Sequence, residues 1–553
     1  MAIWLGSRES RVLPNVSYLS GMTSFHDSRL HKSSSRPRGL QCLFLLISLL
    51  VVGCPGEEPI ANDDDSSPAG DDDDSSQVGD DDDSSEEDCD DACPEGQACN
   101  EADQCVDVFS CPPEDFGPIT TDAGPGDVFI TWLPTKEVGN VAVKVRLPVM
   151  PRYIDRAGVV VNAATFFTTT GPFYTDLEAT ELGLIHISYV WPGSEEPSSG
   201  ACSEGIFDHG GPVSIAVLRD VIRYALGDYT DIEGRSLGDR MDTNQMTADP
   251  DNVGIWAFSH PGIGAINALA RYPAELADVA WFVGRENPTQ DQHASVELGH
   301  FAENGERVLN PLYVYPDGYS SGELAMDMSG AGWNPDFIEA GHEDEPGRAF
   351  FDLDGDGFDT DVDHVLSFRI PTMYGKRYLS RPLTAALRAN GLSEANWPKD
   401  LATPEEAEAA WSYRNSVDRY PDLAGRSLRA MLVYGSRQHV QPLPDATSVH
   451  SAWDGLRGAG LWVRINPDQA YATWASDGQN LFTSDGDANE APPDWATAGA
   501  DWGHSGLTQT GAVGGGKAAG LAAVAEMADR TEFDRWDLNL TNVLVPGFPP
   551  PAF

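Results

Sequence analysis

Apolar and polar residues alternate most clearly between Val141 and Leu147. Val141, Val143, Val145 and Leu147 are separated there by Ala142, Lys144 and Arg146. A period of two places the apolar side chains on one face, which predicts a half-buried strand. Val128–Trp132, just upstream, is the expected hairpin partner.

Short continuous apolar runs follow, and they predict strands covered on both faces. These runs are Ala157–Ala163, Leu182–Trp191, Val253–Phe258, Val279–Val283, Met431–Tyr434 and Leu461–Ile465. Helices are predicted over Gly211–Leu226, from its apolar residues at helical spacing, and over the Gly- and Ala-rich segment Gly511–Met527. Strands that alternate with helices predict an α/β fold with a mainly parallel sheet, whose site lies at the carboxyl ends of the strands.

The stretch from Asp249 to Pro273 predicts a sharp strand-to-helix junction. Asp249–Asn252 has the composition of a turn, Val253–Phe258 that of a buried strand, and helical spacing begins after Pro261. Ser259 therefore falls on the bend between strand and helix. Such a bend exposes a serine side chain and directs the next backbone N–H at a developing oxyanion.

This junction and the order of the elements resemble the α/β-hydrolase superfamily, over roughly residues 126–530. The most specific part is DPDNVGIWAFSH, and a lipase- or dienelactone-hydrolase-like branch is the expected relative. The resemblance implies an α/β-hydrolase domain over 126–553 with a cap insertion at about 287–368. It also implies hydrolysis through a nucleophilic serine.

The elbow departs from the family's G-x-S-x-G pattern, because it reads Ala257-Phe258-Ser259-His260-Pro261. Pro261 suits a first helical turn, where no backbone donor is needed. A proline disfavours the helical conformation at the residue before it, however, and the N–H of His260 is the one that should serve the oxyanion. Gly262 is expected to supply the close approach one residue late. The plainer alternative makes Ser259 an ordinary strand-end residue.

The resemblance implies a general base after the last strand. His504, which precedes the Gly- and Ala-rich helix, is the expected base, and His439 and His450 are its rivals. For the oxyanion hole, the expected donors are the N–H of His260 and one from Ala164 or Thr165.

The orienting acid is the least well-defined partner. The family pattern G-x-x-D after the strand Met431–Tyr434 has Gln438 at the Asp position, and Gln cannot stabilise an imidazolium as a carboxylate does. Asp445 is the first substitute. Glu286, after the preceding strand, is the second, and Asp468 is the third.

A second chemical site is predicted in the segment DLDGDGFDTDVD. Oxygen ligands occupy loop positions 1, 3, 5, 9 and 12, a backbone carbonyl serves at position 7, and glycine occupies position 6, as in a calcium loop. The expected ligands are Asp352, Asp354, Asp356, Phe358 (by its carbonyl), Thr360 and Asp363. Aspartate at position 12 is shorter than the usual glutamate. Because no flanking helices are evident, a lone structural calcium loop is expected, with a metal-free acidic turn as the alternative.

The N-terminus predicts export. Arg36 and Arg38 precede an apolar run that ends in Val51-Val52-Gly53-Cys54, which resembles a bacterial lipobox with lipidation of Cys54. Residues 1–53 are thus a predicted lipoprotein signal segment, with an ordinary secretory signal as the alternative. Pro55 favours the outer membrane or cell surface over retention at the inner membrane.

Residues 54–88 predict a disordered acidic linker. A nine-residue unit repeats three times between Asn62 and Asp88, as NDDDSSPAG, DDDDSSQVG and DDDDSSEED. Such blocks repel one another and bury nothing. They account for much of the formal net charge of −52, whose sign argues against a nucleic-acid partner.

Six of the 8 cysteines follow this linker, and in an exported chain they predict disulfides. They are Cys89, Cys93, Cys99, Cys105, Cys111 and Cys202. Two bridges are expected within a mini-module at residues 89–111, with no pairing chosen. A third is expected from Cys111 to Cys202, which ties the module to the main domain.

Three functions fit the sequence. The first is a lipid-anchored esterase that acts on a small ester or lipid-like substrate through Ser259 and His504. The second is a serine peptidase on the same fold. The third is a non-catalytic surface binding protein, suggested by Gln438 and the altered elbow.

Overall fold

The computed structural model describes residues 119–163, 177–289, 328–340, 346–366, 376–434, 447–467 and 513–536, together with shorter stretches between them. All of these belong to one of two units, Ser84–Phe553. Cys54, Cys89, Cys93, Ala164, Thr165, His439, Asp445, Asp468 and His504 lie outside the described residues, as do the predicted signal segment and acidic linker.

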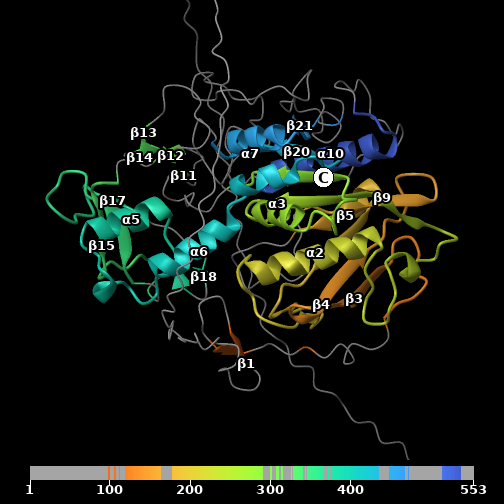
Figure 1. Ribbon diagram of the computed structural model, residues 1–553, viewed down its shortest axis with the longest axis horizontal. Coiled ribbons are helices and arrows are strands. Elements are labelled where there is room, and N and C mark those ends of the chain that lie inside the picture. The colour runs from red at the N-terminus through yellow and green to blue at the C-terminus, as the bar shows by residue number, and fades with distance from the viewer. Residues whose placement is uncertain are drawn as a thin grey trace, which may run out of the picture. The chain divides into compact units, whose positions relative to one another are not determined.

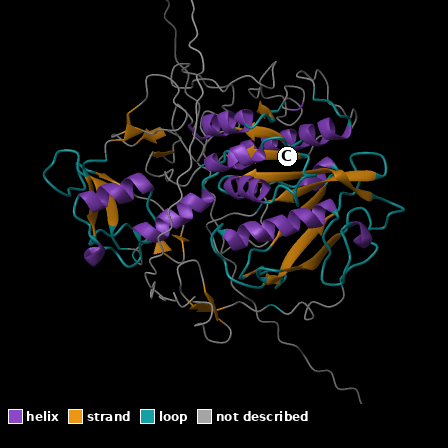
Figure 2. Ribbon diagram, viewed as in Figure 1, coloured by secondary structure: helices purple, strands orange, loops and turns teal. Residues whose placement is uncertain are grey.

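An eight-stranded sheet forms the centre of the main domain, in the order β21-β20-β10-β9-β5-β6-β4-β3 (Figures 1 and 2). Its strands are β3 (Val128–Thr135), β4 (Gly139–Arg146), β5 (Arg156–Asn162), β6 (Ile185–Tyr189), β9 (Thr247–Phe258), β10 (Trp281–Arg285), β20 (Arg429–Val433) and β21 (Trp462–Ile465). β3 and β4 form the predicted antiparallel hairpin, β4 is antiparallel to β6, and every other pairing is parallel. The predicted α/β fold with a mainly parallel sheet is confirmed.

Helices cover both faces of this sheet. They are α2 (Pro212–Leu226), α3 (Pro261–Arg271), α7 (Thr447–Gly458) and α10 (Val513–Glu532). Along β9, Ile255 and Ala257 pack in one hydrophobic cluster with residues of α2, α3 and α7, whereas Trp256 packs in another with residues of α10. Figure 1 shows α2 and α3 beside the strands. A strand buried on both faces needs a continuous apolar run, which is why these segments lack alternation.

Asp249–Asn252 lie within β9 as a bulge, so their prediction as a turn that precedes the strand was wrong. Gly158 of β5 pairs with Asp249, and the next residue, Val159, pairs with Val253. Asn252 is buried in the bulge, where its amide donates to Ala528 of α10 and accepts from Trp281 of β10. One of the polar residues that predict a turn, Asn252, instead satisfies buried groups of α10 and β10.

The segment between β10 and β20 forms the insertion. Its strands are β11 (Gly299–Phe301), β12 (Arg307–Leu309), β13 (Tyr313–Val314), β14 (Ala325–Met326), β15 (Ala331–Asn334), β16 (Arg348–Phe351), β17 (His364–Val365), β18 (Thr372–Met373) and β19 (Lys376–Arg377). Its helices are α5 (Arg381–Ala389), η4 (Glu394–Asn396), α6 (Pro404–Arg414) and η5 (Val417–Leu423).

The packed part of the insertion extends beyond the predicted end near residue 368. Leu383 and Leu387 of α5 share one buried cluster with Phe351 of β16. At the base of the insertion, the backbone N–H and the hydroxyl of Ser416 both donate to the carbonyl of Thr289. These bonds hold its two ends side by side, so the insertion closes near Ser416.

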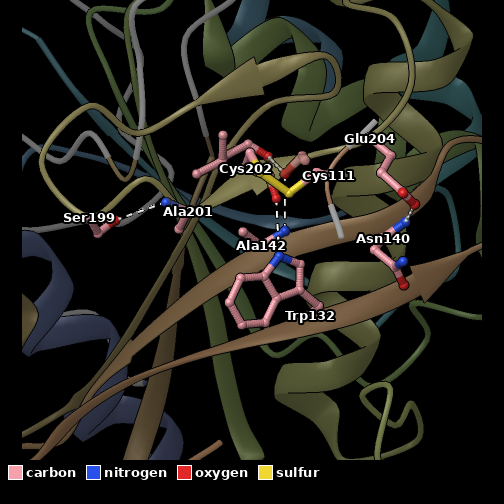
Figure 3. The surroundings of a disulfide bond; sticks show 10 residues. Cys111, Trp132, Asn140, Ala142, Ser199, Ala201, Cys202 and Glu204 are labelled. Atoms are coloured by element: carbon pink, nitrogen blue, oxygen red, sulfur yellow. Dashed lines mark hydrogen bonds between the residues drawn. A yellow bond between two sulfur atoms is a disulfide. The ribbon is translucent and has the colours of Figure 1, made fainter. Parts of the chain in front are cut away.

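A disulfide joins Cys111 to Cys202, which confirms the predicted third bridge (Figure 3). Cys202 belongs to β8 (Cys202–Ser203), which pairs with β7 (Ser194–Glu195). Its carbonyl accepts the indole N–H of Trp132 from β3. In the cysteine module, β1 (Gln97–Cys99) pairs with β2 (Cys105–Asp107), and Cys105 is also disulfide-bonded. The remaining elements are η2 (Ala179–Leu182) and η3 (Gly238–Arg240).

Among the helices that the structure describes, none combines the length and the apolar composition needed to cross a bilayer.

Candidate active site

Ser259 occupies the tight turn between β9 and α3. β9 lies between β5 and β10 and ends at Phe258, and α3 begins at Pro261. Ser259 has φ = 63°, in the left-handed region, and its side chain is only partly buried. The turn therefore presents its hydroxyl at the carboxyl edge of the sheet, as the sequence predicts.

The left-handed conformation costs an L-residue roughly 1–2 kcal/mol, so neighbouring groups must hold it. The backbone N–H of Ser259 donates to the carbonyl of Arg285 at 2.9 Å, and its carbonyl accepts from Gly262 at 3.0 Å. Backbone strain that is held in place at a partly exposed serine is typical of a functional site.

The backbone conformation of His260 differs from the one expected for a residue that precedes a proline. Its φ of −53° and ψ of −32° are helical, so it adopts the conformation that Pro261 disfavours. One imidazole nitrogen, Nδ1, lies 3.4 Å from the hydroxyl oxygen of Ser259. The close approach at Gly262 is made to the side chain of Asn287, because an added Cβ would come within 2.2 Å of it.

Glu286 is the candidate acid that the structure places at the elbow. Arg285 pairs with Phe258, so Glu286 and Ser259 each come one residue past paired strand ends. Glu286 is buried, has φ = 48°, and donates its backbone N–H to Val433 of β20. Its rivals Asp445 and Asp468 follow β20 and β21 in the chain but lie outside the described residues.

The expected base, His504, falls between the end of β21 and the start of α10 in the chain, outside the described residues. Its rival His450 is buried in α7. Ala164 and Thr165 come directly after Ala163, whose N–H extends the pairing of β5 with β9 by donating to Trp256. β5 and β21, which precede Ala164 and His504 in the chain, are parallel to their neighbours and end at the carboxyl edge of the sheet.

Three residues of this edge were missed by sequence reasoning. They are Asn287, Tyr434 and Asn466, whose hydrogen bonds link the serine turn to the ends of β20 and β21. The only signal is that Asn287 and Asn466 each precede a proline, in E-N-P and I-N-P. Such dipeptides mark turns but do not reveal the partners of the amide.

His209 lies just before α2 and is buried, with φ = 52°. Its carbonyl accepts from the guanidinium of Arg414, at the end of α6. Burial, with a smaller contribution from the charge of Arg414, lowers the pKa of His209 to about 4. The imidazole is therefore neutral at pH 7.

We predict that His209 makes the protein acid-sensitive. Between pH 6.5 and pH 4 the unfolded chain binds a proton at His209 that the folded chain does not, so the stability should fall as the pH falls. The loss should approach about 3 kcal/mol, at about 1.4 kcal/mol per pKa unit. Urea unfolding at several pH values should show a flatter profile for His209→Asn, which keeps a residue that tolerates positive φ. Parallel profiles for the two proteins would exclude His209 as the cause.

The acidic loop joins β16 to β17, so strands flank it, as expected for a lone loop without EF-hand helices. Carboxylate oxygens of Asp352, Asp354 and Asp356 lie within 4.8 Å of one another. Glycines with positive φ, Gly355 and Gly357, make the tight turn. A hydrogen bond to Asp354 and the charge of that carboxylate raise the pKa of Asp356. A cation would relieve this repulsion.

The remaining predicted calcium ligands, Phe358, Thr360 and Asp363, are not part of this carboxylate cluster. The carboxylate of Asp363 accepts backbone N–H groups from Leu353 and Asp359. The ring of Phe358 packs edge-on against Phe350 and Phe337, which anchors the loop. Thr360 is exposed.

No protein-family model matches the chain, and no curated protein does. Among solved structures, dipeptidyl peptidase 4 of Porphyromonas gingivalis is 8% identical with a TM-score of 0.30, covering 62% of this chain and 31% of its own. Prolyl oligopeptidase B of Galerina marginata is 9% identical with a TM-score of 0.28, and the match covers 60% of this chain and 31% of the oligopeptidase. An esterase of Pyrobaculum calidifontis is 12% identical with a TM-score of 0.31, covering 62% and 73%.

The chain spans less than a third of the length of the two peptidases. Likeness at this level carries no argument about activity. The α/β-hydrolase fold follows from the sheet itself, with its antiparallel start, its central strand that ends in the serine turn, and its two later parallel strands.

Proposed function

We propose that the protein is an exported serine hydrolase that cleaves carboxylic esters through an acyl-enzyme on Ser259. The observation that carries the proposal is the left-handed conformation of Ser259 on a two-residue turn between β9 and α3. A serine held there at the carboxyl edge of a mainly parallel sheet is the arrangement of a nucleophile elbow.

In the proposed reaction, the hydroxyl oxygen of Ser259 attacks the ester carbonyl carbon and its proton passes to the imidazole of His504. The backbone N–H groups of His260 and of Ala164 or Thr165 stabilise the oxyanion. Collapse of the tetrahedral intermediate releases the alcohol, which takes the proton from the imidazolium. Water then attacks the acyl-enzyme with the same imidazole as base, and the imidazolium returns the proton to the oxygen of Ser259 as the carboxylic acid leaves.

The acid that orients the imidazole is proposed to be Asp445, with Glu286 and Asp468 as alternatives. Glu286 gains support from its position beside Ser259 at the ends of paired strands. In that case a carboxylate that follows β10 would replace the aspartate that the family pattern has after β20, where this chain has Gln438.

Ester hydrolysis is favoured over peptide hydrolysis by the chemistry of the leaving group. An amine must be protonated by the imidazolium as it leaves, whereas an alcohol is a better leaving group. A site with Gln438 where the family pattern has aspartate provides weaker support for the imidazolium. The serine peptidase is therefore the second candidate, and a non-catalytic surface binding protein is the third.

A matched pair of chromogenic substrates with the same acyl group, one ester and one anilide, separates these candidates. For an esterase, we expect the ester to be hydrolysed well above the background rate and the anilide to be hydrolysed little or not at all. Efficient cleavage of the anilide would favour the peptidase. Hydrolysis of neither, together with no reaction with a fluorophosphonate, would leave the binding protein.

We further propose that Cys54 carries a lipid which anchors the chain at the outer membrane or cell surface. The support is the lipobox-like Val51–Cys54 after an apolar run. The acidic repeats would then act as a spacer between the membrane and the folded domain.

We also propose that the loop from Asp352 to Asp363 binds a structural calcium ion. The proposal is supported by the carboxylate oxygens of Asp352, Asp354 and Asp356, at loop positions 1, 3 and 5, which lie within 4.8 Å of one another. The carbonyl of Phe358, Thr360 and Asp363 would complete the ligand set. Extracellular calcium sites of this kind bind weakly, with Kd of about 10⁻⁴–10⁻³ M.

Calcium is expected to raise the melting temperature of the protein and a chelator to reverse the shift. At about 100 times the Kd, calcium stabilises by about 2.7 kcal/mol. Asp354→Asn should abolish the response, because it removes one converging carboxylate. Asp361→Asn, which changes an exposed carboxylate at a position that does not bind metal, should retain it. Equal melting temperatures of the wild type with calcium and with chelator would contradict the site.

A further inference from the structure

Three strands end at the carboxyl edge of the sheet in backbone conformations that are uncommon for residues other than glycine. Ser259 after β9, Glu286 after β10 and Asn466 after β21 have φ values of 63°, 48° and 60°. Such conformations persist only where surrounding groups determine them. The carboxyl edge therefore contains a structure that holds these ends, and its hydrogen bonds can be traced.

The first part of this structure is the side chain of Asn287, which lies beneath the elbow. Its amide nitrogen Nδ2 contacts three carbonyl oxygens: that of Ser259 at 2.6 Å, that of Ala257 at 3.0 Å and that of Arg285 at 3.2 Å. The side chain is buried and fits between two glycines, since a Cβ at Gly262 or Gly284 would come within 2.2 Å of it.

The second part is Tyr434, the residue that follows β20. Its hydroxyl donates to the backbone carbonyl of Asn287 at 2.5 Å. Burial raises the pKa of Tyr434, so the hydroxyl remains a donor throughout the physiological range. Tyr434 thus joins the end of β20 to the residue that supports the elbow.

The third part is Asn466, the residue that follows β21. Its side-chain oxygen accepts the backbone N–H of Tyr434 at 2.9 Å, and its side-chain nitrogen donates to the carbonyl of Tyr434 at 2.9 Å. Its own backbone N–H donates to Leu432 of β20. The hydrogen bonds therefore run continuously from the serine turn, through β20, to the end of β21.

We propose that Asn287, Tyr434 and Asn466 are positioning residues, which hold the Ser259 elbow in register with the segments after β20 and β21. This inference rests on the proposed function, in which those two segments supply the acid Asp445 and the base His504. None of the three side chains needs to touch the substrate. Their role is to hold the serine turn in a fixed position relative to the ends of β20 and β21.

The inference predicts a loss in kcat rather than in KM. Tyr434→Phe removes one hydroxyl and leaves the carbonyl of Asn287 without its donor. A small displacement of the elbow should lower kcat by tenfold or more, on the order of the cost of a misplacement below 1 Å, with KM within about twofold. Asn287→Ala should have the larger effect. The matched control is Tyr224→Phe, which removes a buried hydroxyl on α2 and should leave kcat unchanged.

Amide hydrogen exchange on the intact protein separates this inference from the proposed function. In Tyr434→Phe, peptides that cover Ala257–Gly262 should exchange roughly tenfold faster than in the wild type, whereas Tyr224→Phe should leave them unchanged. If the wild type lacks hydrolytic activity but the exchange rate responds, the proposed function fails and the hydrogen-bonded chain stands. If the wild type is active and neither kcat nor exchange responds in Tyr434→Phe, the positioning role is overturned. If kcat falls by the same factor in Tyr224→Phe, the loss has a general structural cause and the inference is also overturned.

Discussion

Replacing Ser259 by alanine should abolish ester hydrolysis while leaving the protein folded. Loss of the nucleophile in a serine hydrolase lowers kcat by roughly 10⁶-fold, because the covalent route is removed and only binding and oxyanion stabilisation remain. Serine and alanine bear the same strain at φ = 63°, so the free energy of unfolding should change little. The measurement is steady-state ester hydrolysis beside a urea unfolding curve for each protein.

Ser259→Gly provides the matched control for stability. Glycine adopts a positive φ without steric cost, so this variant should be as stable as the wild type or more stable by up to about 1 kcal/mol. It should nevertheless be inactive. A variant that gains stability and loses activity at one residue is expected where strain serves function. Retention of ester hydrolysis by both variants would mean that another residue is the nucleophile.

The second large effect is expected at the buried ion pair between Arg152 and Asp529. Two nitrogens of the guanidinium donate to the carboxylate, at 2.6 and 2.8 Å, and both side chains are fully buried. The hydroxyls of Tyr153 and Tyr471 donate to the same carboxylate. Asp529→Ala should therefore leave a buried cation without its partner and cost about 3–5 kcal/mol in unfolding free energy.

Two comparisons test this assignment. Arg388→Ala, which affects ion pairs between exposed side chains, should cost less than about 1 kcal/mol. The double variant Arg152→Met with Asp529→Leu should recover much of the loss, because it leaves no unpaired buried charge. A small effect of Asp529→Ala alone would show that water or a second carboxylate compensates for the lost partner.

The central part of the fold follows from local patterns in the sequence. β4 of the hairpin is predicted by strict alternation, and the parallel strands by short apolar runs, because burial on both faces favours apolar side chains. Ser259 is predicted at the bend because the apolar run ends at Phe258 and a helix-compatible proline follows two residues later.

Apart from the Cys111–Cys202 bridge, several features that depend on contacts distant in the chain are missed. The polar residues Asp249–Asn252 read as a turn, and only the positions of Ala528 and Trp281 explain why Asn252 lies buried within a strand. The support of the elbow by Asn287 and Tyr434 joins residues 147 apart, which no local pattern encodes. The end of the insertion is missed for the same reason, because the hydrogen bond from Ser416 to Thr289 that joins its two ends depends on tertiary packing.

Reaction of the intact protein with a fluorophosphonate, followed by mass mapping of the labelled peptide, is the most direct test of a nucleophile at the β9–α3 turn. We expect one phosphonylated site, Ser259, and no labelling of Ser259→Ala or of heat-unfolded protein. An unlabelled wild type, or equal labelling of Ser259→Ala, would contradict it.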